Sequence, residues 1–348
     1  MLSLILALVQ AQPHAPAPRT TGLVVLLGER ARDAEVPELA GGEPRLLLTA
    51  GAAASRAQPG ALHLDPARRF AAEDRELCEK VRSAERIEIG NGALVDWIEV
   101  LYPRRHPTAL VQALIEAHRA GRTLVGRGEA AGVLSAAAAI DDITELRGTH
   151  ADPHDAEQPL AAWMLGFQPW ALIDEETRAT GSLERWLSVL QHDRLRLGLF
   201  LDAEAAWIID RDSESLVARA GGVSLALDTR NARNDLQRLR DARLSMLASG
   251  DQWRARRRDA HLEGERAALA SAPARQVQLQ ENLLELDRLV ETLAALPPDS
   301  RHVTLQDARG VVIELEADEL TTVAVDDAGR TRWAELRASL DWRALARR

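Results

Sequence analysis

Between residues 22 and 139, short apolar runs alternate with amphipathic segments. The runs Gly22–Gly28 and Arg45–Gly51 are almost continuously apolar, which is typical of parallel strands buried on both faces. From Pro107 to Gly121, apolar positions recur at four-residue spacing between an initial proline and a final glycine, which predicts a helix. Further strands are predicted at 61–65, 86–92, 123–128 and 168–176, and three more within 196–228. This alternation predicts an α/β fold with a doubly wound, mostly parallel sheet.

The segment Thr123–Ala139 has the pattern of a strand, a glycine turn and an Ala-rich helix. Gly128 and Gly132 have the spacing of a nucleophile elbow, a strained turn that presents a reactive side chain at its middle position. The middle residue here is Ala130, which carries no reactive group. A dinucleotide-binding loop is the competing interpretation, but this turn follows four predicted strands and lacks the acidic residue expected about 20 positions later.

The pattern changes after Asp228. Residues 231–296 are charged and favour helix, and the apolar positions of 279–296 fall on one helical face. Residues 301–325 predict a β-hairpin or meander with its turn at 308–310, and 332–347 predict a final helix. The second half is therefore expected to be a helical and small β extension at 229–348, following an α/β domain at 22–228.

Residues 1–21 contain an apolar run followed by a Pro/Ala-rich spacer. This arrangement predicts a signal peptide and export to the periplasm or outside the cell, although the first residues carry no Lys or Arg. A cytoplasmic chain is the alternative. No later apolar run reaches about 18 residues, so no membrane-spanning helix is expected.

Charge and composition narrow the function classes. The net charge of −10 argues against binding to nucleic acid, whose phosphates repel such a surface. A single cysteine, Cys78, excludes an internal disulfide and a thiolate metal cluster. His150 and His154 are four residues apart, but Pro153 between them favours a loop. No metal and no cofactor is therefore predicted, whereas an oligomer is compatible with the sequence.

The order of elements over 22–228 resembles the cyanophycinase and peptidase S51 family, whose flavodoxin-like fold is similar to that of class I glutamine amidotransferases. The segments GLVVLLGER, IGNGALVDWIEVL and RAGRTLVGRGEAAGVLS carry this resemblance, with Ala131 and Gly132 matching the Ala-Gly of the family's elbow. The resemblance implies a peptide-binding cleft formed by Gly90, Asn91, Gly92, Gly128, Ala131, Gly132 and Asp174.

The resemblance also implies where the catalytic residues would be. The family's nucleophilic serine falls on Ala130, its histidine on Glu176 and its later glutamate on Ala203, with Asp202 retained beside it. Serine hydrolysis needs a hydroxyl, a base and a group that orients the base. The expected function is therefore that of a catalytically inactive relative, which retains the binding of a peptide or a protein partner.

Two alternatives remain open from the sequence. An active hydrolase of acidic or β-aspartyl peptides would need an unorthodox residue set, drawn from Glu129, Ser135, Glu176 and Glu204. Ser135 lies more than one helical turn beyond Ala130, and a glutamate at Glu129 is also what a helix dipole favours in its first turn. The other alternative is a structural or assembly protein that acts through the extension.

Overall fold

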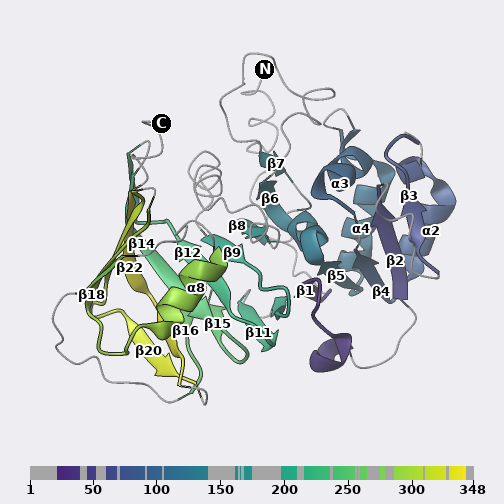
Figure 1. Ribbon diagram of the computed structural model, residues 1–348. Coiled ribbons are helices and arrows are strands. Elements are labelled where there is room, and N and C mark those ends of the chain that lie inside the picture. Colours follow the sequence, from purple (N-terminus) through teal and green to yellow (C-terminus); the bar gives the residue numbers. More distant parts are fainter. Residues whose placement is uncertain are drawn as a thin grey trace.

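The computed structural model forms two large sheets and a two-stranded one, with few helices (Figure 1). It describes residues 22–39, 45–51, 60–68, 71–90, 92–103, 106–139, 161–163, 165, 168–174, 197–209, 215–235, 238–254, 257, 259–264, 275–278, 286–308, 310–326 and 329–341. Strands far outnumber helices in the described part of the chain, and many of them pair in antiparallel fashion. The expectation of a mostly parallel, doubly wound, flavodoxin-like fold is therefore wrong.

The first sheet has nine strands in the described part of the chain, and five of them are parallel. Its order is β16-β15-β11-β10-β1-β5-β4-β2-β3. The parallel strands are β1 (Val24–Leu27), β2 (Arg45–Ala50), β3 (Leu62–Leu64), β4 (Arg86–Ile89) and β5 (Thr123–Arg127). The antiparallel ones are β10 (Ala206–Ile209), β11 (Leu216–Ala220), β15 (Gln252–Arg254) and β16 (Asp259–His261). The apolar runs near the start of the chain thus form strands as predicted.

The two faces of the parallel strands are covered differently. Helices α2 (Arg75–Ser83), α3 (Leu94–Leu101) and α4 (Ala109–Arg119) pack with one set of alternating strand residues, which includes Leu26, Leu48, Ile87 and Leu124. The other set, which includes Val25, Leu27 and Val125, packs with Ala31, Val36 and Leu39, which flank the short 3-10 helix η1 (Asp33–Glu35) or lie in η2 (Pro37–Leu39). Another 3-10 helix, η4 (Ala71–Glu73), precedes α2. Helix α4 confirms the predicted helix between Pro107 and Gly121.

The second sheet has the order β17-β18-β19-β22-β14-β12-β9-β8-β6-β7, with β13 added beside β14. Its strands are β6 (Ser135–Ala139), β7 (Ala161–Trp163), β8 (Gln168–Asp174), β9 (Leu197–Phe200), β12 (Ser224–Asp228), β13 (Arg233–Asp235), β14 (Arg238–Leu247), β17 (Arg275–Gln278), β18 (His302–Gln306), β19 (Val312–Glu316) and β22 (Leu336–Asp341). Strands β20 (Thr322–Val325) and β21 (Thr331–Ala334) form the third sheet.

The chain alternates between the two large sheets several times. It leaves the second sheet after β9 to form β10 and β11, returns for β12 to β14, and leaves again for β15 and β16. Strand β12 pairs with β9 on one side and with β14 on the other. The second sheet is therefore continuous across Asp228.

Helix α8 (Leu286–Ala295) packs on the second sheet and contributes buried side chains to the hydrophobic core between them (Figure 1). Leu289 and Leu293 are buried in one cluster with Leu225, Leu244 and Ile313 from the strands. The indole Nε1 of Trp333 donates a hydrogen bond of 3.1 Å to the carbonyl of Leu293. This indole ties the helix to β21.

The expected helical extension is wrong for most of its length. In the described residues beyond 228, α8 is the single α-helix, while 238–247, 331–334 and 336–341 are strands. Strand β22 shows the reason, because Leu336, Ala338 and Leu340 are buried at two-residue spacing. In β14 the alternation is interrupted at Asp241, where φ is 60° and the pairing register shifts. The Arg, Leu and Ala residues of these strands favour helix, so their composition hid the period of two.

The Ala-rich segment after β5 is also not a helix. Residues Gly128–Leu134 form a 3-10 helix, η6, and β6 follows it directly. Strand β6 pairs in parallel with β8 and in antiparallel with β7. A run of alanines has no hydrophobic periodicity, so the sequence alone did not separate a strand from a helix. The strand–turn–helix frame of a nucleophile elbow is therefore absent from this stretch.

Candidate functional site

The turn around Ala130 is buried. Ala130 is 1% exposed, and together with Ala131 it belongs to the main hydrophobic core. Helix η6 packs against β1, β8 and α3. A Cβ atom on Gly126 would lie 2.8 Å from Cα of Ala131, so the close return of the chain over β5 requires glycine there. The methyl group of Ala130 thus fills core space and faces no open cleft.

The two fallback groups beside Ala130 have structural contacts. Ser135 is 0% exposed, and its Oγ donates a hydrogen bond of 2.6 Å to the carbonyl of Gly132. Oε2 of Glu129 accepts a hydrogen bond of 3.2 Å from the backbone N–H of Leu94, the first residue of α3. The residue before that helix, Ala93, offers no side-chain cap, so Glu129 supplies one from a distant segment.

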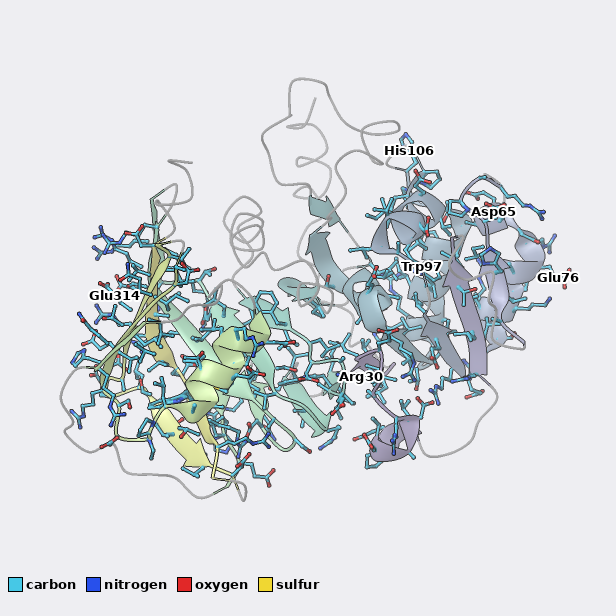
Figure 2. The ribbon with its side chains drawn as sticks, in the orientation of Figure 1. Arg30, Asp65, Glu76, Trp97, His106 and Glu314 are labelled. Carbon is cyan, nitrogen blue, oxygen red and sulfur yellow. The ribbon has the colours of Figure 1, made fainter. Side chains whose placement is uncertain are left out.

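The Asp202–Glu204 segment forms a turn at the carboxyl end of β1. The carbonyl of Ala203 accepts a hydrogen bond of 2.8 Å from the N–H of Arg30. Oδ1 of Asp202 accepts a hydrogen bond of 2.8 Å from the N–H of Glu204, and this bond closes the turn. Glu204 is exposed and lies 3.8 Å from the guanidinium of Arg30, which is labelled in Figure 2. An exposed pair at this distance contributes little to stability.

Several of the predicted positions meet at one end of the first sheet. Leu27 pairs with Arg127, so the turns that begin at Gly28 and Gly128 are neighbours. Gly90 follows the end of β4 next to Arg127, and Gly92 lies against the carbonyl of Ala50 at the end of β2. In the second sheet, Asp174 ends β8 beside Phe200, which precedes the Asp202 turn. Asn91, Glu176, His150, His154 and the predicted leader 1–21 lie outside the described residues.

A charged cluster on the same sheet was not predicted. Glu88 in β4 is 2% exposed, and three guanidinium groups contact its carboxylate. The Nη1 of Arg45 lies at 3.1 Å, the Nη2 of Arg86 at 3.2 Å and the Nε of Arg127 at 2.9 Å. These four residues, together with Asp33 of η1, are called the arginine cluster below.

Asp33 closes the arginine cluster from the side of η1. Its carboxylate accepts hydrogen bonds from Arg86, at 2.5 Å, and from Arg127, and lies 3.7 Å from Arg45. Burial opposes the ionisation of Asp33. The hydrogen bonds and positive charges of Arg86 and Arg127 outweigh it and hold the pKa of this carboxyl below its usual value. Three cations face two anions, so the cluster carries one positive charge in excess.

Arg45 is the most exposed member of the arginine cluster. The Arg45 side chain is 42% exposed, whereas those of Arg86 and Arg127 are largely buried. The Arg-Ile-Glu-Ile alternation at 86–89 was a usable signal, because it places Arg86 and Glu88 on the face opposite both isoleucines. Arg45 and Arg127 lie 43 and 39 residues from Glu88 along the chain, and Asp33 lies 53 residues from Arg86. No local pattern could have joined them.

The described part of the chain contains neither a metal-ligand cluster nor a helix suited to spanning a membrane. None of its His, Cys, Asp and Glu residues form a group of three or more that could hold a metal ion. None of its helices has the length and apolar character needed to cross a bilayer.

Comparison with known proteins gives a distant structural likeness. No family model and no curated protein matches the chain. A solved structure described as a peptidase from an acI-B1 Actinobacterium is similar to it, with a TM-score of 0.45 and 15% sequence identity. The similarity covers 67% of this chain and 96% of that one.

Proposed function

We propose that this chain is a catalytically inactive protein of the cyanophycinase-like, peptidase S51 type that retains a role in binding a peptide or a protein partner. The observation that carries the proposal is the burial of the turn where the nucleophile would be. Ala130 offers a methyl group to the core, and the nearby Ser135 hydroxyl is enclosed and bonded to a carbonyl.

Catalysis by the fallback residues would require them to leave their present partners. A nucleophilic hydroxyl must reach the substrate carbonyl and pass its proton to a base within about 3 Å. Ser135 is covered on all sides, and Glu129 caps α3. These contacts support an inactive protein over an active hydrolase with an unorthodox residue set.

The arginine cluster supports an acidic ligand. Guanidinium groups recognise carboxylates through planar, charge-assisted hydrogen bonds. The Arg45 side chain is partly exposed beside the excess positive charge of the cluster, in a chain whose net charge is −10. An acidic peptide side chain or terminus is therefore the ligand chemistry that this face favours.

Activity is tested with the purified full chain. A fluorophosphonate probe should not label it, and β-Asp-Arg and Asp-Asp dipeptides should not be cleaved. Ser135→Ala serves as the matched variant. Labelling or turnover that disappears in this variant would contradict the proposal and favour the active hydrolase.

Binding is tested by calorimetry with capped tetra-aspartate as the probe and capped tetra-asparagine as its neutral counterpart. Tetra-aspartate should bind at low salt, and Arg45→Ala should weaken it by roughly tenfold, because one charge-assisted hydrogen bond contributes about 1.5 kcal/mol. Arg68→Ala is the control, since Arg68 is an exposed arginine that pairs locally with Asp65. Equal loss in both variants would mean that the arginine cluster is not the site.

A further inference from the structure

Glu335 has an unusual backbone conformation for its residue type. It joins β21 of the two-stranded sheet to β22 of the second sheet, and its φ is 59°. The left-handed region costs a non-glycine residue about 1–2 kcal/mol, so surrounding contacts must hold it. The residue is 8% exposed.

Those contacts come from both large sheets. Oε1 of Glu335 accepts a hydrogen bond of 2.7 Å from the N–H of Ala260 in β16, the edge strand of the first sheet. The backbone N–H of Glu335 donates a hydrogen bond of 3.0 Å to Oγ of Ser245 in β14. Its carbonyl oxygen accepts two hydrogen bonds, one of 2.8 Å from Arg243 and one of 3.2 Å from the hydroxyl of Thr321. Its carboxyl group thus links the first sheet to a corner fixed in the second.

The charges around this carboxyl are already matched with one another. Asp228 of β12 pairs with Arg230, and Asp259 of β16 pairs with Arg254 at 2.6 Å. Arg243 of β14 binds the carboxylate of Asp318 at 2.6 Å and reaches only the carbonyl of Glu335. The adjoining strands and turns carry further charged or titratable groups. These are His261, the ion pair of Arg332 with Asp251, and Arg337, which forms ion pairs with Asp241 and Glu316. Among the described residues, no cation lies within ion-pair distance of the Glu335 carboxylate.

This environment favours the neutral acid. Burial is the largest effect, and the negative charges of Asp228 and Asp259 add to it. Together they outweigh the hydrogen bond from Ala260 and the positive charge of Arg243 and raise the pKa of Glu335 to about 7. The group therefore gains and loses its proton close to neutral pH.

We propose that Glu335 is a proton-controlled latch that holds β16 of the first sheet against the β21–β22 corner. The neutral acid keeps the two sheets together. Its ionisation places an unmatched charge in the junction, which favours opening there and hydration of the carboxylate. This inference is independent of the proposed function, because it uses neither the arginine cluster nor the turn at Ala130.

The sign and size of the effect follow from linkage. A group whose pKa is raised in the closed state stabilises that state fully below its ordinary value of 4.5, and the stabilisation is lost as the pH rises toward 7. Opening at β16 should therefore increase between pH 4.5 and 7 and level off above it. The increase between pH 5 and 8 should be on the order of fiftyfold.

The test is amide hydrogen exchange of the full chain between pH 5 and 8.5, followed at Ala260 and corrected for the intrinsic exchange rate. The wild type should show the increase, and Glu335→Gln, which keeps the acceptor oxygen, should be flat with pH. Glu314→Gln is the control, because Glu314, labelled in Figure 2, is an exposed glutamate of β19 that pairs with Arg238 and not with a group of the junction. It should behave as the wild type.

Two results would overturn the latch. One is a wild-type opening that does not change with pH, and the other is a pH dependence that persists in Glu335→Gln. If this variant does not fold, carbon-13 titration of the Glu335 carboxyl in the wild type decides. A midpoint near 7 supports the latch, and a midpoint below about 5.5 refutes it.

Discussion

At the scale of single residues, the chain holds two buried glutamates whose surroundings differ in kind. Glu88 is enclosed by guanidinium groups, whereas Glu335 has none within ion-pair distance among the described residues. Burial costs each carboxylate its hydration, and the effect on the protein depends on what replaces the water. Neutralising Glu88 should therefore destabilise the protein, whereas neutralising Glu335 should stabilise it.

Replacing Glu88 by Gln should destabilise the protein. The change leaves Arg45, Arg86 and Arg127 with Asp33 as their remaining carboxylate, and breaking a buried ion pair costs about 3–5 kcal/mol. Urea denaturation measures the loss. Glu76→Gln, which removes an exposed i,i+4 partner of Lys80, should change stability by less than about 0.5 kcal/mol. Equal effects would show that the cluster has no special role in stability.

Replacing Glu335 by Gln should stabilise the protein as the pH rises. The gain in free energy of unfolding over the wild type should grow between pH 4.5 and 7 and reach about 3 kcal/mol at most. Asp33 acts in the opposite sense. Its lowered pKa gives stability that is present above 3.8 and lost as the pH falls below it. Denaturation curves from pH 3 to 8 separate the two, and a pH-independent gain would contradict this assignment.

Restoring a hydroxyl at Ala130 should not restore hydrolysis. The site is enclosed by core side chains, so Ala130→Ser would bury a polar group at a cost of about 1–3 kcal/mol and would not expose it to substrate. The fluorophosphonate probe checks this directly. Labelling of the variant would show that the turn opens toward solvent.

At the scale of elements, both central helices take their N-terminal caps from remote carboxylates. Glu129 accepts a hydrogen bond from the N–H of Leu94 in α3, and Glu73 accepts one from the N–H of Ala109 in α4. The residues that precede these helices, Ala93 and Thr108, make no side-chain cap. The helices are thereby tied to η6 and η4, which surround the parallel strands.

Removing the cap of α3 should loosen that helix. Glu129→Ala should lower the free energy of unfolding by about 1 kcal/mol, because the N–H of Leu94 loses its acceptor. The measurement is thermal unfolding followed by circular dichroism. Glu79→Ala, an exposed substitution within α2, is the comparison and should have a smaller effect. A reversed order would mean that the Glu129 contact is not a cap.

The elements also show how far sequence patterns reach in this chain. Continuous apolar runs marked β1 and β2, and a proline and glycine marked the limits of α4, because these signals are local. The predictions of helix for the Ala run at β6 and for the Arg-rich strand β14 were wrong, because pairing with distant strands makes both segments β-strands. The arginine cluster joins residues distant in the chain, so it emerged only from the fold.

At the scale of the molecule, the two large sheets share their strands between both halves of the chain. A chain cut after Asp228 would lack β14, β15, β16 and β22, and β12 would lose a neighbour along its whole length. Unpaired edges of this kind promote aggregation. The truncated chain should therefore be insoluble or unfolded, as judged by size-exclusion chromatography and circular dichroism. A soluble, folded monomer would show that the first 228 residues form an independent unit.

The position of β22 sets the order in which the protein can be made. It fills the gap between β19 and β14, although it is formed by residues 336–341. Until the ribosome has released those residues, two strands in the middle of the second sheet lack the partner that separates them. The sheet can therefore close only after residues 336–341 have left the ribosome, and the nascent chain needs protection from contacts with other chains during that interval.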